Sequence, residues 1–103
     1  MANKYHARRT TIDNITFDSK REANRYLVLL SMQQAGDIYD LQLQPRWPLI
    51  VNKVKIGRYT ADFIYQTRDG KQVVEDVKGV KTRDYVLRKK LMKALYDIDV
   101  QEV

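Results

Sequence analysis

Residues 59–79 impose the strongest constraint on how this chain can fold. Two runs rich in aromatic and β-branched residues, 59–65 and 73–78, flank an Asp-Gly pair. Such runs on either side of an Asp-Gly turn are typical of a β-hairpin. Because successive side chains of a strand point to opposite faces, we expect Asp76 and Lys78 to lie together on one face of the second strand.

Charged side chains within these apolar runs indicate a functional site. Asp62 lies in the first run and Asp76 in the second, among Val, Ile and Phe residues. Ionised groups in such surroundings are costly unless they are paired or bound to a cation, and functional sites are where perturbed ionisable groups gather. Alternation places Glu75 on the opposite face, which makes Asp76 the favoured ligand, although twist at the strand end could bring Glu75 to the same site.

The size and composition of the chain fit a single domain, residues 1–103, with a modest core. The chain contains no cysteine and one histidine, which excludes disulfides, thiolate metal sites and a zinc site built on histidines. No apolar run approaches the ~20 residues that span a bilayer, and the first residues lack the apolar segment of a signal peptide. We therefore expect a cytoplasmic protein.

The charge of the chain favours a polyanionic partner. Nineteen Lys and Arg residues against thirteen Asp and Glu residues give a net charge of +6. Such an excess most often indicates nucleic acid, whereas the alternative is an ordinary soluble basic protein with a solvated basic face. The cations that we expect to contact phosphate are Lys81, Arg83, Arg88, Lys89, Lys93, Arg8, Arg9 and Lys20.

Local patterns predict the remaining elements. Residues 10–17 form a small hairpin that turns at Asp13-Asn14, so residues 1–18 make up an N-terminal arm and hairpin. A capping box at Ser19 and Glu22 starts a helix that runs to about residue 34. The other predicted elements are extended segments at 38–44, 49–51 and 54–56, with a turn or bulge at Gly57, a second helix at 84–96 that Thr82 could cap, and a last strand at 98–103.

Helical spacing also predicts which faces of the two helices are buried. The expected stripe of the first helix is Ala23, Tyr26, Leu27, Leu30 and Gln34. The expected stripe of the second helix is Leu87, Leu91, Ala94 and Leu95. Between the helices, Pro45 and Pro48 are expected to break the backbone ladder.

Connection lengths predict an α/β fold with a mixed β-sheet. Short connections between the first three strands of the sheet predict an antiparallel meander, and the helical crossover after residue 78 should return the last strand parallel. One helix could cover each face of this sheet, or both helices could lie near one face.

The two acids and the lysine together predict phosphodiester chemistry. If Asp62 and Asp76 converge at the open end of the hairpin, their oxygens suit a hard divalent cation such as Mg²⁺ or Mn²⁺. A bound metal polarises a phosphate oxygen and lowers the pKa of its water. Lys78 could then stabilise negative charge that develops at phosphorus.

The pattern of Asp62, a gap of thirteen residues, and then Asp76-Val77-Lys78 resembles the signature of the PD-(D/E)XK nuclease superfamily. This resemblance covers nearly the whole chain and implies a restriction-endonuclease-like αβββαβ core behind a short N-terminal hairpin. Residues 17–23, 41–45, 61–63 and 75–79 are similar to those of a small phage-associated family of that superfamily, to the transposon end-cleaving nuclease subunit and, more distantly, to Holliday-junction resolvases.

The resemblance implies a role for each matching position. Asp62 and Asp76 match metal ligands, the Val77 carbonyl often completes the site, and Lys78 matches the catalytic lysine. Glu22 matches a glutamate of the first helix that binds metal directly or through water. The chain departs from the superfamily name in having alanine before Asp62, a position that varies widely among these enzymes.

These implications predict a metal-dependent DNA endonuclease, acting on branched or Holliday-junction DNA in phage recombination or packaging, as a homodimer, in the host cytoplasm. Four alternatives remain open. The fold could serve as a catalytically weak module that binds DNA or a protein, or the substrate could be RNA or a modified host DNA. A capping role could explain Glu22, and a structural ion pair with Asp76 or Glu75 could explain Lys78.

Overall fold

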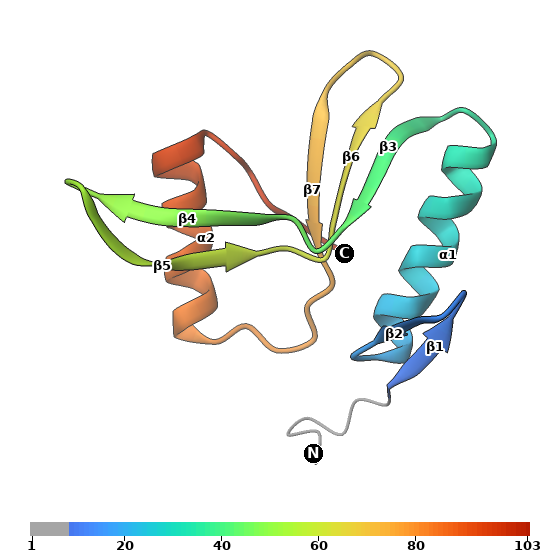
Figure 1. Ribbon diagram of the computed structural model, residues 1–103, viewed down its shortest axis with the longest axis horizontal. Coiled ribbons are helices and arrows are strands. Elements are labelled where there is room, and N and C mark those ends of the chain that lie inside the picture. The colour runs from blue at the N-terminus through green and yellow to red at the C-terminus, as the bar shows by residue number, and fades with distance from the viewer. Residues whose placement is uncertain (1–8) are drawn as a thin grey trace.

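The computed structural model describes residues 9–103, in which a four-stranded mixed sheet lies at the centre of the molecule (Figure 1). The spatial order of its strands is β3-β6-β7-β8. A second antiparallel pair, β4–β5, and the N-terminal pair, β1–β2, lie outside this sheet. The elements are β1 (Thr10–Ile12), β2 (Ile15–Phe17), α1 (Lys20–Gln34), β3 (Ile38–Leu43), β4 (Arg46–Val51), β5 (Val54–Thr60), β6 (Phe63–Thr67), β7 (Gln72–Asp76), α2 (Arg83–Tyr96) and β8 (Gln101–Glu102).

The predicted α/β class and mixed sheet are confirmed. Strands β3, β6 and β7 form an antiparallel meander, and β8 returns parallel to β7 after the α2 crossover. The β6–β7 turn lies at the Asp-Gly pair, where Gly70 takes a positive φ of 86° that glycine adopts without steric cost. The N-terminal hairpin also turns as expected, with positive φ at both Asp13 and Asn14.

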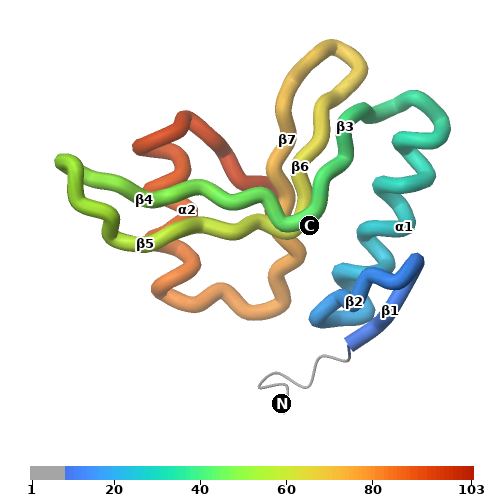
Figure 2. The backbone as a smooth tube through the Cα atoms, in the orientation of Figure 1, coloured from blue at the N-terminus to red at the C-terminus, as the bar shows by residue number. Residues whose placement is uncertain are grey.

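The hairpin β4–β5 is inserted between β3 and β6. Figure 2 shows the chain leaving the sheet after β3, running out and back through β4 and β5, and returning to β6. The prediction of one continuous strand at 59–65 is therefore wrong, because β5 ends at Thr60 and β6 begins at Phe63. At the break, the Asp62 amide turns to the neighbouring strand β7, where it bonds the Glu75 carbonyl over 3.1 Å.

Pro48 lies inside β4, opposite Arg58 of β5, so the expected break at this proline is wrong. A two-stranded ribbon has a free edge on each strand, and a proline whose missing N–H would face that edge removes no ladder bond. A register shift between Leu49 and Ile50 bears out the irregularity expected near Gly57.

Helix α1 begins at the predicted cap, where Ser19 Oγ accepts a hydrogen bond from the Glu22 amide over 3.1 Å. It buries Ala23, Tyr26 and Leu29, and packs them with Phe63 and Tyr65 of β6. The expected burial of Leu27 and Gln34 is wrong, because both are exposed. Leu29, which the spacing argument left out, is fully buried.

Helix α2 begins at the predicted cap Thr82, whose Oγ1 accepts from the Tyr85 amide. Its buried residues are Tyr85 and Met92. Of the expected stripe, Leu91 is partly buried, whereas Leu87, Ala94 and Leu95 are exposed. The last strand is shorter than expected and covers only Gln101–Glu102.

One helix covers each face of the sheet, which settles the alternative that the sequence left open. The core under α1 contains Phe63 and Tyr65, whereas the core under α2 contains Val74 and Val100. Neither helix of the described residues is long and apolar enough to cross a bilayer.

Candidate active site

Asp62 and Asp76 meet at the point where β7 ends and β6 begins. The Asp62 amide donates to Asp76 Oδ1 over 3.0 Å, and Asp62 Oδ2 accepts from the Val77 amide over 2.7 Å. The strand break at residues 61–62 makes this exchange possible, because it frees the Asp62 main chain and side chain to face β7. The predicted convergence of the two acids is thus present, although Asp62 lies between strands rather than within one.

Asp76 is the more enclosed of the two acids, with 1% of its surface exposed. Its Oδ2 accepts a hydrogen bond from the hydroxyl of Tyr59, a buried residue of β5. The hairpin β4–β5 therefore contributes directly to the site, through a residue that the sequence argument did not single out. The sequence offered no signal for this contact, because it depends on the turn that the chain makes at residues 61–62.

Glu22 brings a third carboxyl group near the two aspartates from α1. Its side chain is buried, and it lies close enough to Asp62 and Asp76 for their charges to act on its ionisation. Burial, together with the nearby charges of Asp62, Asp18 and Asp76, raises the pKa of Glu22 to about 7. The amide of Glu22 caps the helix through Ser19 while its carboxyl faces the acids, so capping and a role at the site are compatible.

Lys78 lies on the same side of β7 as Asp76, as alternation predicts. Its Nζ is 4.0 Å from Asp76 Oδ2 and 4.6 Å from the centre of the ring of Tyr85, a buried residue of α2. The ring holds the ammonium group through a cation–π contact. A lysine held in this way is positioned beside the carboxylates and still partly exposed, with 28% of its side-chain surface open to solvent.

The electrostatics of the site favour a cation. Burial raises the pKa of Asp62 and raises that of Asp76 to about 6, while the charge of Lys78 lowers both. Both aspartates and Glu22 therefore resist becoming charged together. A divalent cation would relieve this repulsion, since it attracts the ionised form of each acid.

The oxygens of Asp62 and Asp76 fit the needs of Mg²⁺ or Mn²⁺. An ionised carboxylate has about four lone-pair positions, so Asp76 can accept its two hydrogen bonds and still bind a metal. Within residues 9–103, no three His, Cys, Asp or Glu side chains are gathered into a ready-made metal cluster. Mg²⁺ commonly uses one or two carboxylates and keeps several waters, a need that Asp62 and Asp76 fit. The roles of Glu22 and the Val77 carbonyl as ligands stay predictions.

Glu75 points away from this site to the opposite face of the sheet. Its carboxylate receives two hydrogen bonds from Arg25 of α1, over 2.8 and 2.7 Å, and a third from the Tyr65 hydroxyl. Only 2% of Glu75 is exposed. These partners neutralise the buried charge of Glu75 on the opposite face. The alternative that strand twist brings Glu75 to the cation site is therefore not supported.

Most of the predicted phosphate-binding cations in α2 and just before it are engaged with acids. Lys81 and Lys89 pair with Glu102, Lys93 pairs with Asp97 and Asp99, and Arg88 pairs with Asp84. Within the described part of the chain, no ion pair is formed by Arg9, Lys20 or Arg83, all of which are exposed. Arg8 lies outside the described residues.

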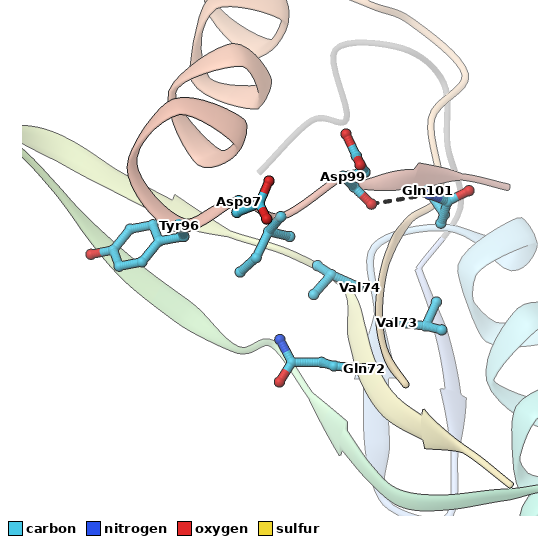
Figure 3. Close-up of a pocket in the computed structure, with 8 residues that line it drawn as sticks. Gln72, Val73, Val74, Tyr96, Asp97, Asp99 and Gln101 are labelled. Carbon is cyan, nitrogen blue, oxygen red and sulfur yellow. Dashed lines mark hydrogen bonds between the residues drawn. The ribbon is translucent and has the colours of Figure 1, made fainter. Parts of the chain in front are cut away.

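A separate hollow of about 470 Å³ lies away from the carboxylates. Its lining comes from the start of β7 and from the segment that joins α2 to β8 (Figure 3). Residues Gln72, Val73 and Val74 contribute one wall, two or more residues before Asp76 along the strand. None of the predicted site residues lines it.

Comparison with known proteins identifies one family. A family model described as "Protein of unknown function (DUF1064)" matches residues 2–102, which is nearly the whole chain. No curated protein and no solved structure gives a significant match.

Proposed function

The chain belongs to the DUF1064 family, whose function is unknown, and we propose that it is a divalent-metal-dependent DNA endonuclease. The observation that carries the proposal is the meeting of Asp62 and Asp76 beside Lys78 at the end of β7. The finer fold assignment, an αβββαβ core of the restriction-endonuclease type, belongs to the same proposal. In its support, removing the inserted hairpin from the element order leaves α1, β3, β6, β7, α2 and β8.

The reaction would be hydrolysis of a phosphodiester bond. A bond forms between a water oxygen and phosphorus, and the bond from phosphorus to a sugar oxygen breaks. When bound, a divalent cation supplies Lewis-acid polarisation of the phosphate and a water of lowered pKa. Asp62 and Asp76 would hold that cation, with Glu22 as a third ligand either directly or through water.

Lys78 would act on the phosphate itself. The Tyr85 ring holds its ammonium group, and the Nζ atom of that group is 4.0 Å from Asp76 Oδ2. A fixed positive charge placed where negative charge develops lowers the barrier, because it needs no reorganisation during the reaction. The same contact with Asp76 would serve as a structural ion pair if no cation entered the site.

The decisive experiment compares Asp76→Asn with the wild type in Mg²⁺ and Mn²⁺ on linear, flapped and four-way DNA and on a matched RNA. Asparagine keeps the shape of the side chain and removes its charge. Because a metal ligand contributes several kcal/mol, losing its charge should slow cutting by at least about a hundredfold. Asp40→Asn, at an exposed aspartate of β3, is the matched control. Equal cutting by wild type and Asp76→Asn would overturn the proposal, and the substrate panel would separate branched DNA, linear DNA and RNA.

A second candidate function is a nuclease-like fold that binds DNA or protein without efficient catalysis. The observation in its favour is that both oxygens of Asp76 already accept hydrogen bonds, from Tyr59 and from the Asp62 amide. Titration with Mn²⁺ by calorimetry separates the two candidates. A catalytic site should bind the ion and lose it in Asp62→Asn, whereas a binding module should give no heat with either chain.

A further inference from the structure

We propose that the β4–β5 hairpin is the element by which this chain holds the phosphate backbone of duplex DNA. The inference rests on the proposed function in taking DNA as the polyanion. It moves the expected contact surface from α2, whose cations are largely engaged with acids, to the inserted hairpin.

All the charged residues of the hairpin are basic. Between residues 45 and 60 the chain has four basic residues, Arg46, Lys53, Lys55 and Arg58, and no acidic one. All four are exposed. Within residues 9–103, none of their side chains forms an ion pair, which contrasts with the paired lysines of α2.

One face of the hairpin is anchored and the other is open. Leu49 and Tyr59 pack with Tyr85 and Met92 of α2, and the Tyr96 hydroxyl donates to the Pro48 carbonyl over 2.6 Å. Figure 1 shows the hairpin crossing α2 and extending away from the central sheet. Its inner face thus packs against the core, whereas its outer face is exposed to solvent and can contact a ligand.

Strand register places basic residues on that outer face. Residues opposite each other in an antiparallel pair share a face, and the next pair along points the other way. Trp47 and Tyr59 are opposite each other and face inward, so the adjacent pairs Arg46 with Thr60 and Pro48 with Arg58 face outward. Arg46 and Arg58 therefore lie on the open face as diagonal neighbours on adjacent strands.

The size of the hairpin suits a groove of duplex DNA. A strand of six residues, such as β4, spans about 20 Å, which equals about six base pairs at ~3.4 Å each. The major groove admits a two-stranded ribbon of this kind. Ile50, an exposed aliphatic residue that alternation along β4 places on the same face as Arg46 and Pro48, could then contact sugars while the cations neutralise phosphates.

The hairpin also leads to the carboxylates. Tyr59 of β5 donates to Asp76, and Asp62 follows the end of β5 by two residues. A duplex held along the hairpin would therefore run toward Asp62 and Asp76 at its base. This arrangement gives the contact surface a direct relation to the proposed site of cutting.

The test measures binding of a fluorescent linear duplex in EDTA, where no cutting can occur. Arg46→Gln with Arg58→Gln should weaken binding about 10- to 100-fold and lower the slope of log K against log salt by nearly 2, since each lost phosphate contact removes about 0.9. Arg68→Gln with Lys71→Gln removes the same charge from two residues that pair with acids at the far end of the β6–β7 hairpin. This control should bind almost as the wild type does.

Three results of the binding experiment would overturn the inference. They are equal loss in both double variants, an unchanged salt slope in the hairpin variant, and no duplex binding by the wild type. Thermal unfolding of each variant checks that the exposed substitutions leave the fold intact. A wild-type dimer in sedimentation that dissociates in Ile50→Glu with Val54→Glu would instead make the hairpin a self-association surface, which also overturns it. Because EDTA removes divalent ions, a failure of cleavage alone leaves the binding result unaffected.

Discussion

The main-chain amide of Asp62 donates to the Oδ1 atom of Asp76 over 3.0 Å, and the Asp62 side chain accepts from the amide that follows Asp76. The carboxylate of Asp76 is therefore oriented by the main chain of Asp62, and the carboxylate of Asp62 by the main chain of Val77. Such reciprocal bonds hold two carboxylates in place before any ligand arrives, which is the condition for a preorganised cation site.

Tyr59→Phe tests whether the hydrogen bond to Asp76 orients that carboxylate. Removing the hydroxyl leaves a buried charge with one donor fewer, so Mn²⁺ affinity should fall about 10- to 100-fold, as for other groups that orient a ligand. The free energy of unfolding should fall by about 1–3 kcal/mol. Calorimetry and urea unfolding measure the two effects. Tyr39→Phe, at an exposed tyrosine of β3, is the control, and unchanged Mn²⁺ affinity in Tyr59→Phe would contradict the role given to this bond.

Lys78→Met separates catalysis from cation binding. Loss of the ammonium group should slow cutting by about a hundredfold, because charge at phosphorus is no longer stabilised. Mn²⁺ affinity should rise or stay the same, because a positive charge 4.0 Å from Asp76 is gone. Lys71→Met, at an exposed lysine near the β6–β7 turn, should change neither property. If Lys78→Met instead lowers Mn²⁺ affinity and leaves cutting intact, Lys78 has only a structural role.

Arg25→Met tests the ion pair on the opposite face of the sheet. The substitution leaves the carboxylate of Glu75, of which 2% is exposed, without its two guanidinium bonds. An unpaired buried charge costs about 3–5 kcal/mol, so the midpoint of urea unfolding should fall sharply. Adding Glu75→Gln to Arg25→Met should restore part of the loss. Glu75→Gln alone should leave Mn²⁺ affinity unchanged, and a large effect on Mn²⁺ would place Glu75 at the site.

The pH dependence of stability reports on Glu22. Burial raises its pKa from 4.5 to about 7, so the folded state binds a proton that the unfolded state has lost between these values. This stabilisation is complete below about pH 4.5 and disappears as pH rises through about 7. In EDTA, the wild type should therefore lose more stability than Glu22→Gln across that range. Parallel curves for the two chains would contradict the raised pKa, and saturating Mn²⁺ should reduce the difference.

Local sequence signals predicted the frame of this fold well. The capping residues Ser19 and Thr82, the Asp-Gly turn and the Asp13-Asn14 turn act within a few residues of chain. Their conformational preferences are decided by neighbours in sequence, which is why the helix starts and hairpins were predicted correctly. Alternation along β7 likewise predicted that Asp76 and Lys78 share one side and Glu75 takes the other.

Features that depend on distant contacts were not predictable. Helical spacing could not distinguish Leu27 from Leu29 on α1, because the buried face is chosen by the sheet against which the helix packs. The partners of Glu75 come from α1 and β6, up to 50 residues away along the chain. The strand break at residues 61–62 had no local signal, and with it the contact between Tyr59 and Asp76 was missed.

The inserted hairpin has two ends that tolerate change very differently. At its tip, Asn52 and Lys53 both take positive φ in a tight, exposed turn, so added residues there would extend into solvent. At its base, Tyr59 and Asp62 both bond residues of β7, and one extra residue between them would turn one of the two away from Asp76. Variation in loop length, whether natural or engineered, should therefore accumulate at residues 52–53 and be absent from residues 59–62.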